Sequence, residues 1–209
     1  MALLRRILEK LVKPYREILQ YARILNAHSI ARRMFVTNSF DGLLSGLGVI
    51  LGSYLSGASN PINYVGSVIG ASFSMGFFSG VVATYLSERA ERLQELRKTE
   101  RAMLHPLRGS IYEKAAKIVP IYVALWSGLG AMLLPVIGVS PFIFAEILKA
   151  DVSVTVLVYT SAGIMVAELF TLGAYLGKIS GENMFVSGAR LALIGLAAVL
   201  FFTLASVIM

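Results

Sequence analysis

The sequence predicts an all-α polytopic membrane protein with five transmembrane helices. Of its 209 residues, 56% are hydrophobic and only 15% are charged. The mean hydropathy of +0.73 is too high for a soluble domain of this length. Five apolar segments each provide the roughly 20 residues that cross a bilayer core. They cover residues 36–57, 63–86, 117–139, 152–177 and 188–208.

Turn-forming residues separate these segments. Ser, Gly, Asn and Pro cluster at residues 56–61 and 138–141, and again at residues 180–183. Between the second and third spans, a charged helix is predicted to leave the membrane as a stalk, which His105-Pro106 then interrupts. We place this stalk at about residues 88–117 of a transmembrane domain that covers residues 34–209.

The distribution of positive charge predicts the orientation. Lys and Arg are concentrated before the first span, between the second and third, and between the fourth and fifth, whereas the other two connections hold only Lys149. The positive-inside rule therefore predicts an integral membrane protein with a cytosolic N-terminus and an external C-terminus.

The N-terminal segment, residues 1–33, is predicted to form a basic amphipathic helix. Leu and Ile recur at helical spacing opposite Arg and Lys, which suits a helix lying on anionic headgroups. No short apolar core followed by a small-residue cleavage site is recognised there, so we do not expect a cleavable signal. The formal net charge is +7, but the basic residues lie at the ends of membrane helices, so we expect a lipid partner and no nucleic acid.

The residue types limit the metal chemistry. Cysteine is absent, which excludes disulfides and thiolate ligands. Carboxylates, eight Met and two His are the remaining ligands.

Asp41 opens a long apolar helix that carries no further charge before its end. A carboxylate in a membrane span is costly unless it is hydrated, paired or neutralised. The alternative is a capping role: Asn38 or Ser39 would begin the helix, and Asp41 in its first turn would favour the positive end of the dipole.

Two further intramembrane residues are candidates. Glu168 is expected near mid-membrane in the fourth span, where capping cannot explain it; it is either functional or a protonated, hydrogen-bonded packing group. Met75, in the second span, offers a thioether beside small residues, although a Met in a membrane helix also serves as core filler.

The stalk carries Glu88, Glu91 and Glu95 on one helical face. Three carboxylates could capture a hard divalent cation. The alternative is a solvated helix, because Glu88 and Arg92, and Glu95 and Lys98, stand at ion-pair spacing.

Three motifs together resemble the vacuolar iron transporter family, which includes plant nodulin-like members. They are DGLLSGLGVILG in the first span, SFSMGFFSGVVATYLSERAE at the end of the second, and GKISGENMFVSGARLALIGLAA leading into the fifth. The resemblance covers about residues 34–117 and 165–208. It implies a prokaryotic-type member with a short cytosolic loop, located in the cell membrane.

The resemblance also implies a function. The family moves ferrous iron and related divalent ions out of the cytosol in exchange for protons, as a homodimer with the pathway between subunits. Asp41 matches the first-span acid of that pathway, Met75 the second-span methionine, and Glu88 the acid where the second helix leaves the membrane. We expect Fe²⁺ or Mn²⁺ as the transported ion, protons as the coupled partner and no permanently bound cofactor.

The sequence departs from the family at two places. Ser67 stands where a glutamate usually precedes the methionine by two turns, and we expect Glu168 to supply the missing acid. The cytosolic connection lacks the long Glu- and Met-rich insertion, so Glu91, Glu95 and Glu100 form at most a reduced metal-binding set.

Other functions are weighed against transport. A membrane enzyme is not expected, since the chain has no His-Glu-x-x-His or Walker motif and no second Asp near Asp41. A non-transporting assembly or lipid-binding protein is the alternative, given the basic N-terminal segment. The pairs Gly42 and Gly46, and Gly48 and Gly52, are expected to line a dimer face.

Overall fold

The computed structural model describes residues 20–208, and within this range every regular element is helical. Five helices are long and apolar enough to cross a membrane, as predicted. The elements are α2 (Ala27–Leu55), α3 (Pro61–Ser74), the π-helical segment η1 (Met75–Ala83), α4 (Thr84–Met103), α5 (Ile111–Gly138), α6 (Ser140–Leu148), α7 (Val154–Ser180) and α8 (Met184–Ile208).

The helix boundaries follow local capping chemistry. Asn60 accepts a hydrogen bond from the Ile62 backbone N–H at 3.1 Å, and Ser110 accepts one from Glu113 N–H at 3.1 Å. Helix α7 ends at Gly181, whose φ of 75° is the left-handed conformation that glycine tolerates best. The turns predicted at residues 56–61, 138–141 and 180–183 are therefore confirmed.

The first span starts earlier than the sequence indicated. Helix α2 begins at Ala27, so residues 27–33 belong to the same helix as Asp41 and not to a separate N-terminal helix. The rest of the predicted amphipathic segment, residues 1–19, lies outside the described residues.

The second span is a single helix made of α3, η1 and α4, and it continues past the membrane as the predicted stalk. Its middle is unusual, because the nine residues of η1 adopt π-helical turns, in which hydrogen bonds join residues five apart. The stalk ends at Met103, just before His105-Pro106, as expected.

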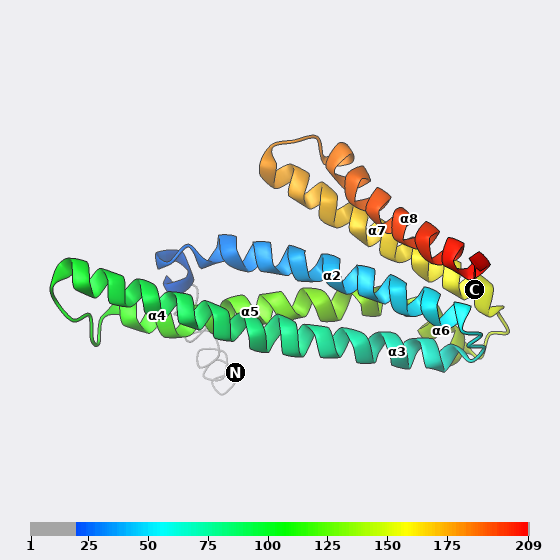
Figure 1. Cartoon of the computed structure of the whole chain (residues 1–209), viewed down its shortest axis with the longest axis horizontal. Helices are drawn as coiled ribbons and strands as arrows, with labels where there is room; N and C mark the ends of the chain where they lie inside the picture. Colours follow the sequence, from blue (N-terminus) through cyan, green and yellow to red (C-terminus); the bar gives the residue numbers. More distant parts are fainter. Residues whose placement is uncertain (1–19, 209) are drawn as a thin grey trace, which may run out of the picture.

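The helices form two groups (Figure 1). Helices α2 and α5 and the α3–α4 helix run side by side, while α7 and α8 form a hairpin. The hairpin meets α2 near α6 and diverges from it toward the turn that joins α7 to α8.

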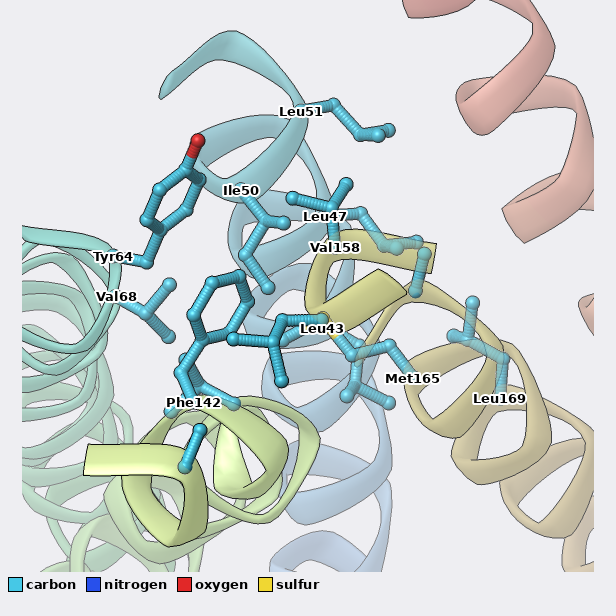
Figure 2. Close-up of a cluster of buried hydrophobic side chains, with 14 of the residues drawn as sticks. Leu43, Leu47, Ile50, Leu51, Tyr64, Val68, Phe142, Val158, Met165 and Leu169 are labelled. Atoms are coloured by element: carbon cyan, nitrogen blue, oxygen red, sulfur yellow. The ribbon is translucent and has the colours of Figure 1, made fainter. Parts of the chain in front are cut away.

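The main core lies where the two groups meet. Figure 2 shows Leu43, Leu47 and Ile50 of α2 facing Val158, Met165 and Leu169 of α7, with Tyr64, Val68 and Phe142 beside them. The Tyr64 and Phe142 rings stack with centroids 4.6 Å apart. Phe142 belongs to α6, a short helix between the third and fourth spans, where the sequence analysis predicted no helix.

Close backbone contacts join α5 to its neighbours. A Cβ added to Gly42 would lie 2.9 Å from the Ala131 carbonyl oxygen, and one added to Gly80 would lie 2.7 Å from Gly128 Cα. Small residues permit such approaches, on which membrane helices depend for packing. Gly42 and Gly46 are thus buried within the protomer, and the expectation that they line a dimer face is wrong. Gly52 has open space around it.

Gly80→Ala is expected to destabilise the protein by about 1–3 kcal/mol, because the new methyl group must push η1 away from the α5 backbone. Gly70→Ala is the matched control on the same long helix, since nothing lies within 4 Å of its added Cβ. Thermal unfolding of the purified variants in detergent measures the difference. Equal melting temperatures for the two variants would contradict the close packing of Gly80 against Gly128.

Candidate functional site

Asp41 lies in the interior of α2, on an exposed face of the protomer. Because the helix begins at Ala27, neither Asn38 nor Ser39 caps it, and the capping explanation for Asp41 is excluded. Within residues 20–208, Asp41 has no ion pair and no side-chain hydrogen bond. The structure therefore leaves an uncompensated carboxylate in a membrane-spanning helix.

Met75 is half-buried at the first residue of η1. The next residue, Gly76, packs against α5, where an added Cβ would lie 2.9 Å from the Gly128 carbonyl oxygen. Ser67, which replaces the usual glutamate of the family, is exposed on α3. The π-helical turns that begin at Met75 turn the following residues away from their places on a regular α-helix, so spacing alone cannot relate Met75 to Glu88.

Glu88 is buried against the bundle where α4 leaves the membrane. Its side chain is 4% exposed, and Glu88 Oε2 lies 3.5 Å from a guanidinium nitrogen of Arg92, which is itself buried. Arg33 of α2 is also close enough to act electrostatically on this carboxylate. Glu88 Oε2 makes no hydrogen bond in the described part of the chain, so its contact with Arg92 is an ion pair without hydrogen-bond geometry.

The other stalk acids are arranged differently. Glu95 pairs with Arg92 from the opposite side to Glu88, while Glu91 is exposed. Glu100 accepts a hydrogen bond from the Leu107 backbone N–H at 2.9 Å and so closes the turn between α4 and α5. Arg92 thus takes the position between two carboxylates that a cation would need. The ion-pair explanation accounts for Glu88 and Glu95, with Arg92, not Lys98, as the partner of Glu95.

Glu168 lies on α7, where its Oε2 atom is shielded and has no hydrogen-bond partner among the described residues. The alternative explanation, in which Glu168 is a hydrogen-bonded packing group, is therefore not supported at this oxygen. One turn earlier, Met165 packs on α2, with its Cε atom 3.0 Å from the Cβ that Gly46 would carry. This contact fixes the depth of Glu168 relative to α2.

A polar chain that the sequence analysis missed fixes the depth of the second span. Asn38 Nδ2 donates to Ser127 Oγ at 2.8 Å, and Ser127 Oγ lies 3.0 Å from Thr84 Oγ1. Asn38, Ser127 and Thr84 thus link α2, α5 and α4 at one level. The signal was present in the sequence as polar residues inside apolar spans, but Asn38 was interpreted as a cap.

The four candidates of the membrane region lie at successive depths. At 1.5 Å per residue, Glu88 lies roughly 6 Å from the Thr84 level toward the stalk, and Asp41 lies roughly 5 Å from the Asn38 level in the other direction. Glu168 lies deeper than Asp41, roughly 5 Å on the stalk side of the contact between Gly46 and Met165. Met75 is the deepest of the four, roughly at the level of that contact.

These side chains do not form a closed cage in one protomer. Among residues 20–208, no three His, Asp or Glu side chains gather in a way that could hold a metal ion. A single protomer therefore offers a sequence of separate oxygen and sulfur ligands and no preformed metal site.

Arg92→Met is expected to lower the stability by about 1–3 kcal/mol, because it leaves the buried Glu88 carboxylate without its partner. The double variant Glu88→Gln/Arg92→Met should recover part of the loss. Arg97→Met is the control, since Arg97 is exposed on the same helix and has no ion pair in the described region. Thermal unfolding of the four proteins gives the comparison, and an Arg92→Met protein as stable as Arg97→Met would contradict it.

Comparisons with known proteins bear on this arrangement. An uncharacterized protein of Methanocaldococcus jannaschii is 30% identical over 162 residues, which cover 76% of this chain and 80% of that relative. No solved structure matches the chain. A model of the VIT family matches residues 88–206, from Glu88 through most of α8, and membership of that family indicates a membrane metal ion transporter. The chain therefore belongs to the VIT family, as its three motifs suggested.

Proposed function

We propose that the protein exports ferrous iron, manganese or both from the cytosol in exchange for protons. It works as a homodimer in the cell membrane of a prokaryote, with the N-terminus in the cytosol and the pathway between the two copies. Family membership supports metal transport. The residues of the membrane region support the choice of ferrous iron or manganese, the exchange for protons and the homodimer.

The observation that carries the proposal is the position of Asp41. It is exposed on the protomer, lies within a membrane-spanning helix, and has no partner among the described residues. A charged group facing lipid at such a depth costs about 3 kcal/mol or more. A second copy or a water-filled pathway would remove that cost, whereas lipid would not.

A dimer also improves the ligand set. One carboxylate is a poor site for a divalent ion, but a two-fold axis near Asp41 would bring two carboxylates together. The Met75 thioether would favour ferrous iron or manganese over magnesium and calcium. A protonated carboxyl group releases its proton when it binds metal, and this exchange is the minimum needed to couple the two flows.

Glu168 is proposed as a further pathway group. Its buried Oε2 lacks a hydrogen-bond partner, and its depth lies between those of Asp41 and Met75. It serves either as a metal ligand or as the group that carries the proton. This acid would replace the second-span glutamate whose position is taken by Ser67.

Glu88 is proposed as the cytosolic entrance of the pathway, because it is the stalk acid that is buried in the bundle. An entering cation would compete with Arg92 for its carboxylate. Capture of metal by Glu91, Glu95 and Glu100 stays a prediction, and their present partners and exposure favour a weak role.

Asp41→Asn is expected to abolish metal flux, because the amide keeps the side-chain shape but loses the charge that attracts the cation. Proteoliposomes loaded with a metal-sensitive dye measure uptake of Fe²⁺ and Mn²⁺ under an imposed pH gradient. Asp151→Asn, the same change at an exposed residue before α7, is the control and should leave flux unchanged. Wild-type protein that moves neither ion would contradict the proposed function.

Mixed dimers extend this test to the shared pathway. When wild-type and Asp41→Asn subunits are co-expressed in varied ratios, flux should fall with the square of the wild-type fraction if both Asp41 side chains serve one pathway. A linear fall would show that each protomer transports alone.

Glu168→Gln is expected to preserve folding while impairing transport in a way that identifies its role. If Glu168 carries the proton, metal flux persists but no longer responds to the pH gradient; if it binds metal, the KM for the ion rises. Glu146→Gln, at an exposed position on α6, is the control. If Glu168→Gln transports normally at every pH, Glu168 is only a packing group.

A further inference from the structure

A cavity lies between α2 and α7, and none of the predicted metal residues lines it. Its volume is about 400 Å³, and Arg32, Arg33 and Thr37 of α2 face Leu176 and Ile179 of α7 across it. Its α7 lining residues, Leu176 and Ile179, belong to the last turns of α7, the part of the hairpin that diverges from α2 in Figure 1. The cavity therefore combines two guanidinium groups with an apolar wall.

A second cavity adjoins the first and shares Arg32 with it. This cavity has a volume of about 300 Å³, and its walls include the aromatic rings of Tyr122, Trp126 and Tyr175. His28 Nδ1 lies 2.9 Å from the Tyr122 hydroxyl. Trp and Tyr are enriched at the level of lipid headgroups, so these rings indicate where the membrane surface meets the bundle.

The charge of the first cavity is not neutralised from within. Arg32 and Arg33 are exposed, and neither forms an ion pair with any of residues 20–208. Glu88 acts electrostatically on Arg33 from outside the cavity lining, and the described residues that line the two cavities include no Asp or Glu. An anion is thus the natural complement of this cavity.

The depth of the cavity favours a lipid. Arg32 and Arg33 precede Asp41 by about 13 Å along α2, at 1.5 Å per residue, so they lie near the end of the membrane-spanning region. Guanidinium groups bind phosphate through paired, charge-assisted hydrogen bonds. Val36, Leu176 and Ile179 offer an apolar surface that continues toward the bilayer core, where an acyl chain would lie.

We infer that this cavity binds one anionic phospholipid, with its phosphate on Arg32 and Arg33 and an acyl chain against α7. The lipid fills the space between the hairpin and α2 and holds the two groups of helices at a fixed separation. The inference depends only on the membrane insertion of α2 and α7, and it is independent of which ion the protein carries.

Native mass spectrometry of the full-length protein in neutral detergent tests this site. Dihexanoyl phosphatidylglycerol and dihexanoyl phosphatidylcholine are added separately, and the bound lipid is counted. The wild type should retain phosphatidylglycerol preferentially. Arg32→Gln/Arg33→Gln should bind it about tenfold more weakly, as expected from the loss of a hydrogen bond between charged groups. Arg97→Gln/Arg101→Gln removes the same charge from exposed positions of α4 and should bind like the wild type.

Ile179→Trp provides a variant that keeps both arginines. It fills the apolar side of the cavity from a partly exposed position, so the protein should fold and still lose phosphatidylglycerol. Equal retention of the two lipids by the wild type, or unchanged binding by both cavity variants, would overturn the inference.

Two further measurements separate other occupants. The first compares inorganic phosphate with soluble headgroup analogues as competitors of phosphatidylglycerol. If phosphate displaces the lipid to the same extent as the analogues and raises the melting temperature by the same amount, the ligand is a free phosphate and the lipid assignment fails. If the cavity variants dissociate the oligomer in size-exclusion chromatography without changing lipid retention, a second copy of the chain covers the cavity and the lipid assignment fails too.

Discussion

Backbone contact along α5 is the interaction on which the rest of the structure depends. In a bilayer, the surrounding lipid is as apolar as the side chains, so helices associate through close packing and hydrogen bonds and gain little from burying apolar surface. Helix α5 provides such packing on two sides: Gly128 meets the π-helical segment at Gly76 and Gly80, and Ala131 meets α2 at Gly42. The chain Asn38–Ser127–Thr84 adds hydrogen bonds at the same helix.

These contacts also direct the functional side chains. Gly42 is pressed against α5, and the preceding residue on a helix points about 100° away, so Asp41 is turned out of the protomer. On the other helix, Gly76 faces α5 and leaves Met75 half-buried at its edge. The packing of small residues therefore determines which way the candidate ligands face, although it places none of them in a closed metal site.

Charge is distributed differently inside and outside the membrane region. At the stalk, Arg92 neutralises Glu88 and Glu95, so two of the acids expected to capture metal already have a cationic partner. In the membrane region, Asp41 and the buried oxygen of Glu168 have none within residues 20–208. Arg32, beside the α2–α7 cavity, also forms no ion pair with these described residues. The unpaired acids thus lie deeper in the membrane region than the unpaired arginine. The deeper level suits a cation, and the level of Arg32 suits an anion.

The sequence by itself determined the helical class, the five spans, their turns and the family, because long apolar segments, turn residues and motifs are local signals. It also identified Asp41 and Glu168 as charges that needed an explanation. Only the tertiary structure decided that α2 begins at Ala27, since Asn38 bonds Ser127 of α5 instead of capping the start of the helix. The π-helical turns of η1, the burial of Phe142 and the pairing of Arg92 depend equally on contacts between helices far apart in the chain, which no local pattern encodes.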